Sequence, residues 1–456
     1  MNTTRNSILS YLIDDAVRML RSKEAVMSKN STLADSIPYK IEAFTDLKNE
    51  LKKNPCMSIS QWHILFQTCH ELYSFLGAIR TADHWQSPSF AGINVDEVGD
   101  EQRHIIANLN DYKRDQHPLG VTWEQAYANA YLTRSFVSTP KAFATTSGMA
   151  ALTVAALVIR TRLPESYRIA IGVHSYFENK ELLHMMFPGA TIKEFEEDDP
   201  ETLKAIQPNA IFFDILANDP TMTVAHVSGI FGVAGRMNHH VDVVVDTTCA
   251  SAIHFRMPKI MRNFSVIGFE SLNKYHQFGL DRTTAGVCWA VGISEDTLYR
   301  VRDHAGVNIP EIAAASLPTP NRAMHAVYLR QLEMNALSIA QTLVRIPGIK
   351  VSYPGLVSHP GHALAKKAGH FGSFVAVEFL NKSWQQYRKA MQKILIEAKK
   401  GGVPIVAGST FGTPVTRIYS WTPRSAYEKP FLRISAGLEA PSEITWVGEV
   451  LGRALL

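Results

Sequence analysis

The sequence predicts an α/β protein built on a mainly parallel sheet with helices on both faces. Between about residues 122 and 291, short apolar runs alternate with segments long enough to form helices. The runs are YRIAIGV, NAIFFDIL, VDVVVDTT, FSVIGFES and AGVCWAV. Continuous runs rich in Val, Ile and Phe are typical of strands buried on both faces, and helices are the usual connections between parallel strands.

Two regions of different texture flank this α/β segment. Residues 1–108 have a mostly helical pattern, as in SILSYLIDDAVRML and SQWHILFQTCHELYSFLGAI. Residues 323–456 begin with a long helical pattern and then combine strand-like FGSFVAVEFL and FLRISAG with the helical WQQYRKAMQKILIEAKK. We therefore expect a helical N-terminal extension (1–108), a large domain (109–322) and a smaller C-terminal α+β domain (323–456).

The composition excludes several classes of protein. Hydrophobic residues make up 46% of the 456 residues and charged residues 19%, as in ordinary globular proteins. The net charge of +4, from 46 basic and 42 acidic residues, does not indicate a nucleic-acid partner. The N-terminal segment is amphipathic rather than a signal peptide, and no segment is apolar enough to span a membrane.

Cysteine and histidine usage favours a reduced, metal-free protein. The four cysteines form no C-x-x-C pair, so we expect a cytoplasmic location and no structural zinc. His63, Cys69 and His70 lie in an aromatic-rich helical pattern without a matching partner elsewhere. We interpret them as core residues and predict no metal ligands.

Three features of the central segment fall where parallel α/β sheets carry their functional groups, at strand ends and helix starts. Residues 145–148, TTSG, precede a helical pattern whose first backbone N–H groups could hold a phosphate. Asp246 ends a buried strand, where a carboxylate needs a partner. Lys274 follows the next strand, where partial burial would lower its pKa and favour Schiff-base chemistry.

Each feature alone also has a simpler explanation: a Ser/Thr helix cap, a turn aspartate and a surface lysine. Together, and in this order, they match the needs of pyridoxal 5′-phosphate (PLP). The helix start would take the phosphate, Asp246 would pair with the pyridinium nitrogen, and Lys274 would hold the aldehyde. No Walker or dinucleotide-binding glycine motif competes with this interpretation.

From about residue 112 to its C-terminus, the chain resembles the Cys/Met-metabolism family of PLP enzymes, which have fold type I. This family includes cystathionine γ-synthase, cystathionine γ-lyase, cystathionine β-lyase and methionine γ-lyase. The resemblance rests on Y-K-R-D-Q-H-P, T-S-G-M-A-A, H-S-Y-F-E-N, V-D-T-T, S-L-N-K-Y, Y-P-G-L-V-S-H-P-G-H and F-L-R-I-S-A-G-L-E, in the family's order. It implies PLP fold type I, with the large domain and the smaller C-terminal domain described above; the helical N-terminal extension is added to the family pattern.

The resemblance also implies the residues that hold the phosphate. The turn T-S-G-M-A-A would bind it through Ser147, Gly148 and Met149. Ser271 of S-L-N-K-Y would contribute as well. Tyr112 and Arg114 of Y-K-R-D-Q-H-P would reach the phosphate of a neighbouring subunit.

The remaining motifs imply the roles at the ring and at the substrate. Tyr176 would stack on the pyridine ring, Asp246 would bind its nitrogen, and Lys274 would form the Schiff base. Asn273 stands where the family has Thr, beside the cofactor. At the substrate end, the residues implied or considered are Arg433 as the α-carboxylate clamp, Ser409 as a helper, and Arg417 as a second cation for a distal anion or for a surface acid.

The implied function is PLP-dependent γ-elimination or γ-replacement, as a lyase or transferase, through an external aldimine and a vinylglycine-type ketimine. Lys274 would be the base, with Tyr176 assisting. The substrate would be an α-amino acid with a leaving group at Cγ: a homoserine ester, a cystathionine- or methionine-type thioether, S-adenosylmethionine or a γ-halo amino acid. β-Elimination, or an aminotransferase or decarboxylase of the same fold, is the alternative.

Departures from the family pattern favour a specialised member. The sequence QFGLD after the lysine and the N-terminal extension are the main ones. The resemblance also implies a homodimer or homotetramer with shared active sites.

Overall fold

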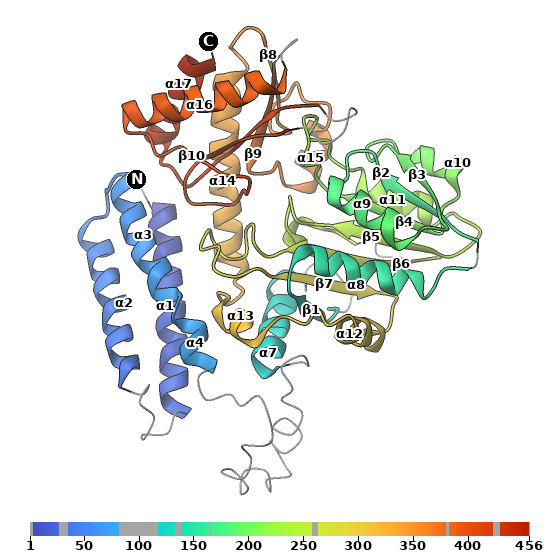
Figure 1. Cartoon of the computed structure of the whole chain (residues 1–456), viewed down its shortest axis with the longest axis horizontal. Coiled ribbons are helices and arrows are strands. Elements are labelled where there is room, and N and C mark those ends of the chain that lie inside the picture. The colour runs from blue at the N-terminus through green and yellow to red at the C-terminus, as the bar shows by residue number, and fades with distance from the viewer. Residues whose placement is uncertain are drawn as a thin grey trace, which may run out of the picture.

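The computed structural model describes residues 3–26, 35–81, 117–132, 139–164, 166–257, 263–379, 383–422 and 429–455. Figure 1 shows a bundle of N-terminal helices at one side, a large sheet with its helices at the other, and a smaller C-terminal sheet beside the long helix α14. The helices are α1 (Thr3–Val26), α2 (Ser36–Lys53), α3 (Ile59–Tyr73), α4 (Leu76–Thr81), α7 (Pro118–Tyr127), η2 (Ala128–Leu132), α8 (Gly148–Arg160), α9 (Phe177–Met186), η3 (Pro200–Thr202), α10 (Leu203–Ile206), α11 (Val227–Ala234), η4 (Ala252–His254), α12 (Glu295–His304), α13 (Glu311–Ser316), α14 (Arg322–Leu343), α15 (His362–Ala368), α16 (Trp384–Gly401) and α17 (Pro441–Leu455).

The large sheet has seven strands in the order β1-β7-β6-β5-β4-β2-β3. They are β1 (Ala142–Thr145), β2 (Arg168–Gly172), β3 (Thr191–Phe195), β4 (Ala210–Asp214), β5 (Val241–Asp246), β6 (Phe264–Ser271) and β7 (Gly286–Val291). From β3 to β6 all neighbours are parallel, whereas β7 is antiparallel to both β6 and β1. The predicted α/β class with a mainly parallel sheet is confirmed.

Alternate residues of the central strands pack into two separate cores, which explains their continuous apolar runs. Phe212, Val244 and Ile267 belong to the core formed with α8, α9 and α12. Val243 and Val245 face the opposite side and belong to the larger core, which extends into the N-terminal and C-terminal parts. With both faces buried, the functional groups of the sheet are confined to the strand ends.

The C-terminal part forms a five-stranded sheet in the order β10-β11-β12-β9-β8. Its strands are β8 (Ile349–Ser352), β9 (Phe374–Phe379), β10 (Val406–Ala407), β11 (Arg417–Ser420) and β12 (Leu432–Ser435). β12 lies between β9 and β11 and is antiparallel to both. Arg433 is therefore held in the middle of the sheet.

Helices α1–α4 pack against the rest of the chain through α13 and α14. An ion pair at 2.5 Å joins Arg5 of α1 to Glu443 of α17, 438 residues further along the chain. Arg80 of α4 donates to the backbone oxygen of Ala315 at 2.6 Å. The predicted domain boundary at 108 lies outside the described residues, and the three-part division remains a prediction.

Candidate active site

The start of α8 forms a cradle for an anion. Ser147 caps the helix, and its hydroxyl accepts a hydrogen bond from the backbone N–H of Ala150 at 3.0 Å. The first backbone N–H groups of a helix have no partner within it, so those of Gly148 and Met149 are available. A Cβ at Gly148 would lie 2.8 Å from Cβ of Ser271. Only glycine lets the helix start approach the end of β6 this closely.

Two buried carboxyl groups lie side by side at the ends of β4 and β5, since Asp214 and Asp246 are paired in the register. Asp246 accepts hydrogen bonds from the backbone N–H of Thr248 at 2.8 Å and from Nδ2 of Asn179 at 3.2 Å. Burial raises the pKa of Asp246 in spite of these bonds. Burial and the neighbouring charge of Asp246 raise the pKa of Asp214 further. A cation bound beside these two carboxylates would offset the cost of burying their charges.

Lys274 lies just beyond β6 and is largely buried. Its Nζ donates to the hydroxyl of Thr410 at 3.2 Å and lies 5.2 Å from the ring centroid of Phe411. Burial and the charge of Arg433 lower the pKa of Lys274. Both causes favour the neutral, nucleophilic amine.

Arg433 is 2% exposed and has no carboxylate partner in the described part of the chain. Its guanidinium donates to Oδ1 of Asn218 at 2.7 Å and to the backbone oxygen of Ser409. The ring centroids of Phe374, Phe411 and Tyr419 lie within 6 Å of its central carbon. A buried arginine held by neutral groups can bind an incoming carboxylate in a bidentate manner.

These groups line one cavity of about 410 Å³. The structure brings together most of the residues predicted from sequence, and they come from both sheets. The predicted residues that line the cavity are Ser147, Gly148, Met149, Tyr176, Asp246, Ser271, Asn273, Lys274, Ser409 and Arg433.

Among the predicted residues that the structure describes, one is not brought to this cavity. Arg417 does not line it, and its charge instead adds to burial in lowering the pKa of His63 on α3. The geometry therefore gives no support to Arg417 as a substrate ligand. Tyr112 and Arg114 lie outside the described residues, and their role stays a prediction.

Sequence reasoning missed Asp214, Asn218 and Thr410, which touch the predicted groups. Asp214 ends a buried strand as Asp246 does, and its backbone partner is the N–H of Tyr176, at 3.1 Å. The argument used for Asp246 would also have found Asp214. Asn218 and Thr410 lie in loops whose approach to Arg433 and Lys274 depends on tertiary packing, so no local pattern marks them.

The residues present fit PLP. The glycine-lined helix start can accept a phosphate, and the buried acids can accept a protonated ring nitrogen. The neutral amine of Lys274 can take an aldehyde, while Arg433 remains for a carboxylate. Asn273 lines the cavity, and its side-chain oxygen accepts the backbone N–H of Ala285 at 3.0 Å, which ties the lysine loop to the start of β7.

Comparison with known proteins gives a family match. The model of the family described as "Cys/Met metabolism PLP-dependent enzyme" matches residues 85–445, which is most of the chain. The bifunctional enzyme flvA of Aspergillus flavus is 26% identical over 66% of this chain and 37% of its own. A probable cystathionine gamma-synthase of Herpetosiphon aurantiacus is 32% identical over 39% of this chain and 56% of its own. The chain thus spans about a third and about half of the lengths of these two relatives.

Solved structures share the fold. The cystathionine gamma synthase of Xanthomonas oryzae pv. oryzae, crystallised in complex with cystathionine, matches with a TM-score of 0.61 at 19% identity. The match covers 76% of this chain and 88% of that one. Among the described residues, none of the helices is long and apolar enough to cross a membrane.

Proposed function

Because the chain belongs to the Cys/Met metabolism family of PLP-dependent enzymes, we propose that it eliminates or replaces a leaving group at Cγ of an α-amino acid. The candidate leaving groups are those of homoserine esters, thioethers such as cystathionine or methionine, S-adenosylmethionine and γ-halo amino acids. The convergence of Lys274, Asp246 and Arg433 on one cavity supports this proposal most strongly.

Arg433 orients the substrate by binding its α-carboxylate. Its guanidinium carbon and Nζ of Lys274 lie 5.4 and 5.2 Å from the ring centroid of Phe411 and line the same cavity. A carboxylate on Arg433 therefore brings the α-carbon of the amino acid close to the lysine amine. Asn218 and the backbone of Ser409 hold the guanidinium in place.

Lys274 moves the protons. Its lowered pKa favours the neutral amine, which can accept the proton from Cα; once it has given this proton up, it can accept the proton from Cβ. When bound, PLP supplies an electron sink for the charge that these proton losses create. Asp246 sustains this sink by stabilising a proton on the ring nitrogen, and Asn179 and Thr248 hold its carboxylate in place.

Tyr176 stands at the start of α9 and lines the same cavity. Its backbone N–H is fixed by Asp214, so the side chain projects from a restrained position. From there, the phenol can give a proton to the departing group at Cγ. If a second substrate then reaches the cavity, the leaving group at Cγ is replaced. If water reaches it instead, the product is hydrolysed to a keto acid.

The products of the purified, PLP-loaded enzyme test this proposal. With O-acetylhomoserine, cystathionine, S-adenosylmethionine and γ-chloro-2-aminobutyrate in turn, we expect at least one to give 2-oxobutanoate, or a new γ-substituted amino acid when a thiol is added. Lys274→Ala is the inactive control. Pyruvate as the sole keto acid would instead establish β-elimination, and amino transfer to a keto acid would establish an aminotransferase.

A further inference from the structure

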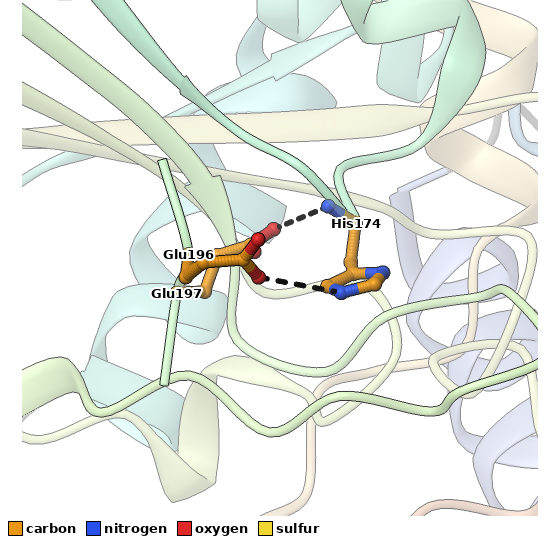
Figure 2. Close-up of side chains that lie close together, drawn as sticks. All are labelled: His174, Glu196 and Glu197. Atoms are coloured by element: carbon orange, nitrogen blue, oxygen red, sulfur yellow. Dashed lines mark hydrogen bonds and ion pairs between the residues drawn. The ribbon is translucent and has the colours of Figure 1, made fainter. Parts of the chain in front are cut away.

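A second group of polar side chains lies where the loop before Tyr176 meets the end of β3. It consists of His174, which follows β2, and of Glu196 and Glu197, which follow β3, and we call it the His174 cluster. One possible ligand atom from each residue lies within 4.8 Å of the other two. Figure 2 shows both carboxyl groups directed to His174, one toward its ring and one toward its backbone nitrogen.

The imidazole of His174 is held in a fixed orientation. Its Nδ1 lies 2.6 Å from Oδ2 of Asp219. Asp219 is itself fixed, because its other oxygen accepts the backbone N–H of Thr221 at 2.9 Å and the hydroxyl of Thr221 at 2.6 Å. An imidazole with one nitrogen bound to a carboxylate presents the other nitrogen as a metal ligand, an arrangement typical of metal-binding histidines. Nε2 of His174 lies 3.8 Å from Oε2 of Glu196.

Glu197 provides a second, independent indication. It is 2% exposed, and its Oε1 accepts the backbone N–H of His174 at 2.8 Å. Its Oε2 is buried and has no hydrogen-bond partner among the described residues. Gly172 makes room for this side chain, since a Cβ there would lie 2.1 Å from Oε1 of Glu197. A buried carboxylate oxygen without a partner is costly unless a proton or a cation accompanies it.

We propose that the His174 cluster binds a divalent transition-metal ion through Nε2 of His174 and one oxygen each of Glu196 and Glu197. One imidazole and two carboxylates suit Zn²⁺, Mn²⁺ or Fe²⁺. Two ligands of a tetrahedral ion with bonds of about 2.0–2.2 Å lie about 3.3–3.6 Å apart, so a small movement of the half-exposed Glu196 would bring its oxygen from 3.8 Å into place. Glu196 is half exposed, so the ion has a path from solvent and water can complete its coordination.

This ion would tie the loop before Tyr176 to the end of β3. The alternative is a protonated His174 that bridges Asp219 and Glu196 without metal. That arrangement satisfies the imidazole, and a proton on the buried Glu197 would then replace the ion beside its Oε2. The two arrangements differ in one measurable property, the binding of a divalent ion at one site per chain.

Calorimetric titration with Zn²⁺ tests the proposal on the PLP-loaded protein, after chelator treatment and in a buffer that does not bind metals. We expect one Zn²⁺ per chain. Affinity should fall by about 10-fold or more in His174→Ala, Glu196→Gln and Glu197→Gln, and by a similar factor in Asp219→Asn, which removes the group that orients the imidazole.

Glu194→Gln is the matched control. Glu194 is an exposed glutamate of β3, two residues before Glu196, and it pairs with Lys180. It should bind Zn²⁺ as the unmodified chain does. Glu196 is half exposed, so Glu196→Gln should fold normally and decide the result even if Glu197→Gln does not fold. The proposal is overturned if no stoichiometric binding occurs, or if these variants bind Zn²⁺ as tightly as the unmodified chain.

Discussion

At the scale of single residues, the most consequential side chains are charged groups buried without an opposite charge. Arg433 is the clearest example, since neutral groups surround it. Such a charge is costly unless a ligand completes its interactions. The expected ligand is the α-carboxylate of the substrate.

Arg433→Ala should lower kcat/KM by about 10- to 100-fold, mostly through a higher KM, because a charge-assisted bidentate contact is lost. Steady-state kinetics measure this, and the visible absorption of bound PLP should persist. Arg453→Ala on the exposed face of α17 serves as the control. An unchanged KM would show that another residue binds the carboxylate.

A second residue-scale prediction concerns Glu439, which is fully buried. Burial raises its pKa from the usual 4.5 to about 7. Between these values the folded chain keeps a proton that the unfolded chain releases, so stability falls as the pH rises from about 4.5 to 7 and then levels off. In the unmodified chain, this lowers the free energy of unfolding by about 3 kcal/mol over that pH range.

The unmodified chain should therefore have a lower free energy of unfolding at pH 8 than at pH 5. In Glu439→Gln this loss between pH 5 and pH 8 should be smaller. Urea unfolding at the two pH values measures the difference. Glu449→Gln, at an exposed glutamate of α17, should leave the pH dependence unchanged. If the free energy of unfolding changed with pH equally in Glu439→Gln and in the unmodified chain, Glu439 would not be the source of the pH dependence.

At the scale of elements, the close approach of α8 to β6 creates the anion cradle. Gly148→Ala would place a Cβ 2.8 Å from Cβ of Ser271 and force the two elements apart. Overpacking of this kind costs about 1–3 kcal/mol, so we expect PLP affinity to fall about 10-fold or more. Equilibrium dialysis with PLP measures it. Gly189→Ala is the control, since nothing lies within 4 Å of a Cβ there.

The N-terminal helices contact the loop that follows Lys274. The ring centroid of Tyr11 lies 5.4 Å from that of Phe278, and Nη1 of Arg282 lies 3.4 Å from Nε2 of His70. Phe278, Gly279 and Asp281 have φ angles of 51°, 84° and 47°. A bulky residue such as Phe278 rarely holds such a conformation unless surrounding contacts impose it.

Tyr11→Ala should therefore loosen this loop and speed the loss of PLP from Lys274. The decay of the visible absorption during dilution measures this loss. Tyr39→Ala removes a tyrosine from α2 that is 73% exposed and should not change the decay. Equal decay in both variants would mean that the helices do not support the lysine loop.

The elements also show what sequence patterns can and cannot predict. Buried strands such as β4 and β5 were predicted because both of their faces are apolar. β3 (TIKEF) was missed because it lies at the sheet edge and is largely exposed. The antiparallel direction of β7 was not predictable either, since an apolar run carries no information about strand direction. Asp246 and Lys274 follow from strand ends, whereas Thr410 depends on how two loops meet.

At the scale of the whole molecule, the predicted oligomer has a direct test. If Tyr112 and Arg114 complete the site of a neighbouring subunit, Lys274→Ala and Arg114→Ala should each be inactive alone. A mixture unfolded and refolded together should regain about a quarter of full activity, because mixed dimers have one intact site. Activity assays of the refolded mixture measure this. No recovery, despite mixed dimers in light scattering, would place Arg114 in its own subunit's site.

The ion pair between Arg5 and Glu443 has a consequence for biosynthesis. Arg5 is made 438 residues before its partner Glu443. The helix α14, which also contacts α1, is made about 100 residues before this partner. Helix α1 can therefore form a bundle with α2–α4 early in translation, but the contacts that fix this bundle to the C-terminal helix α17 form only after residue 443 has been made.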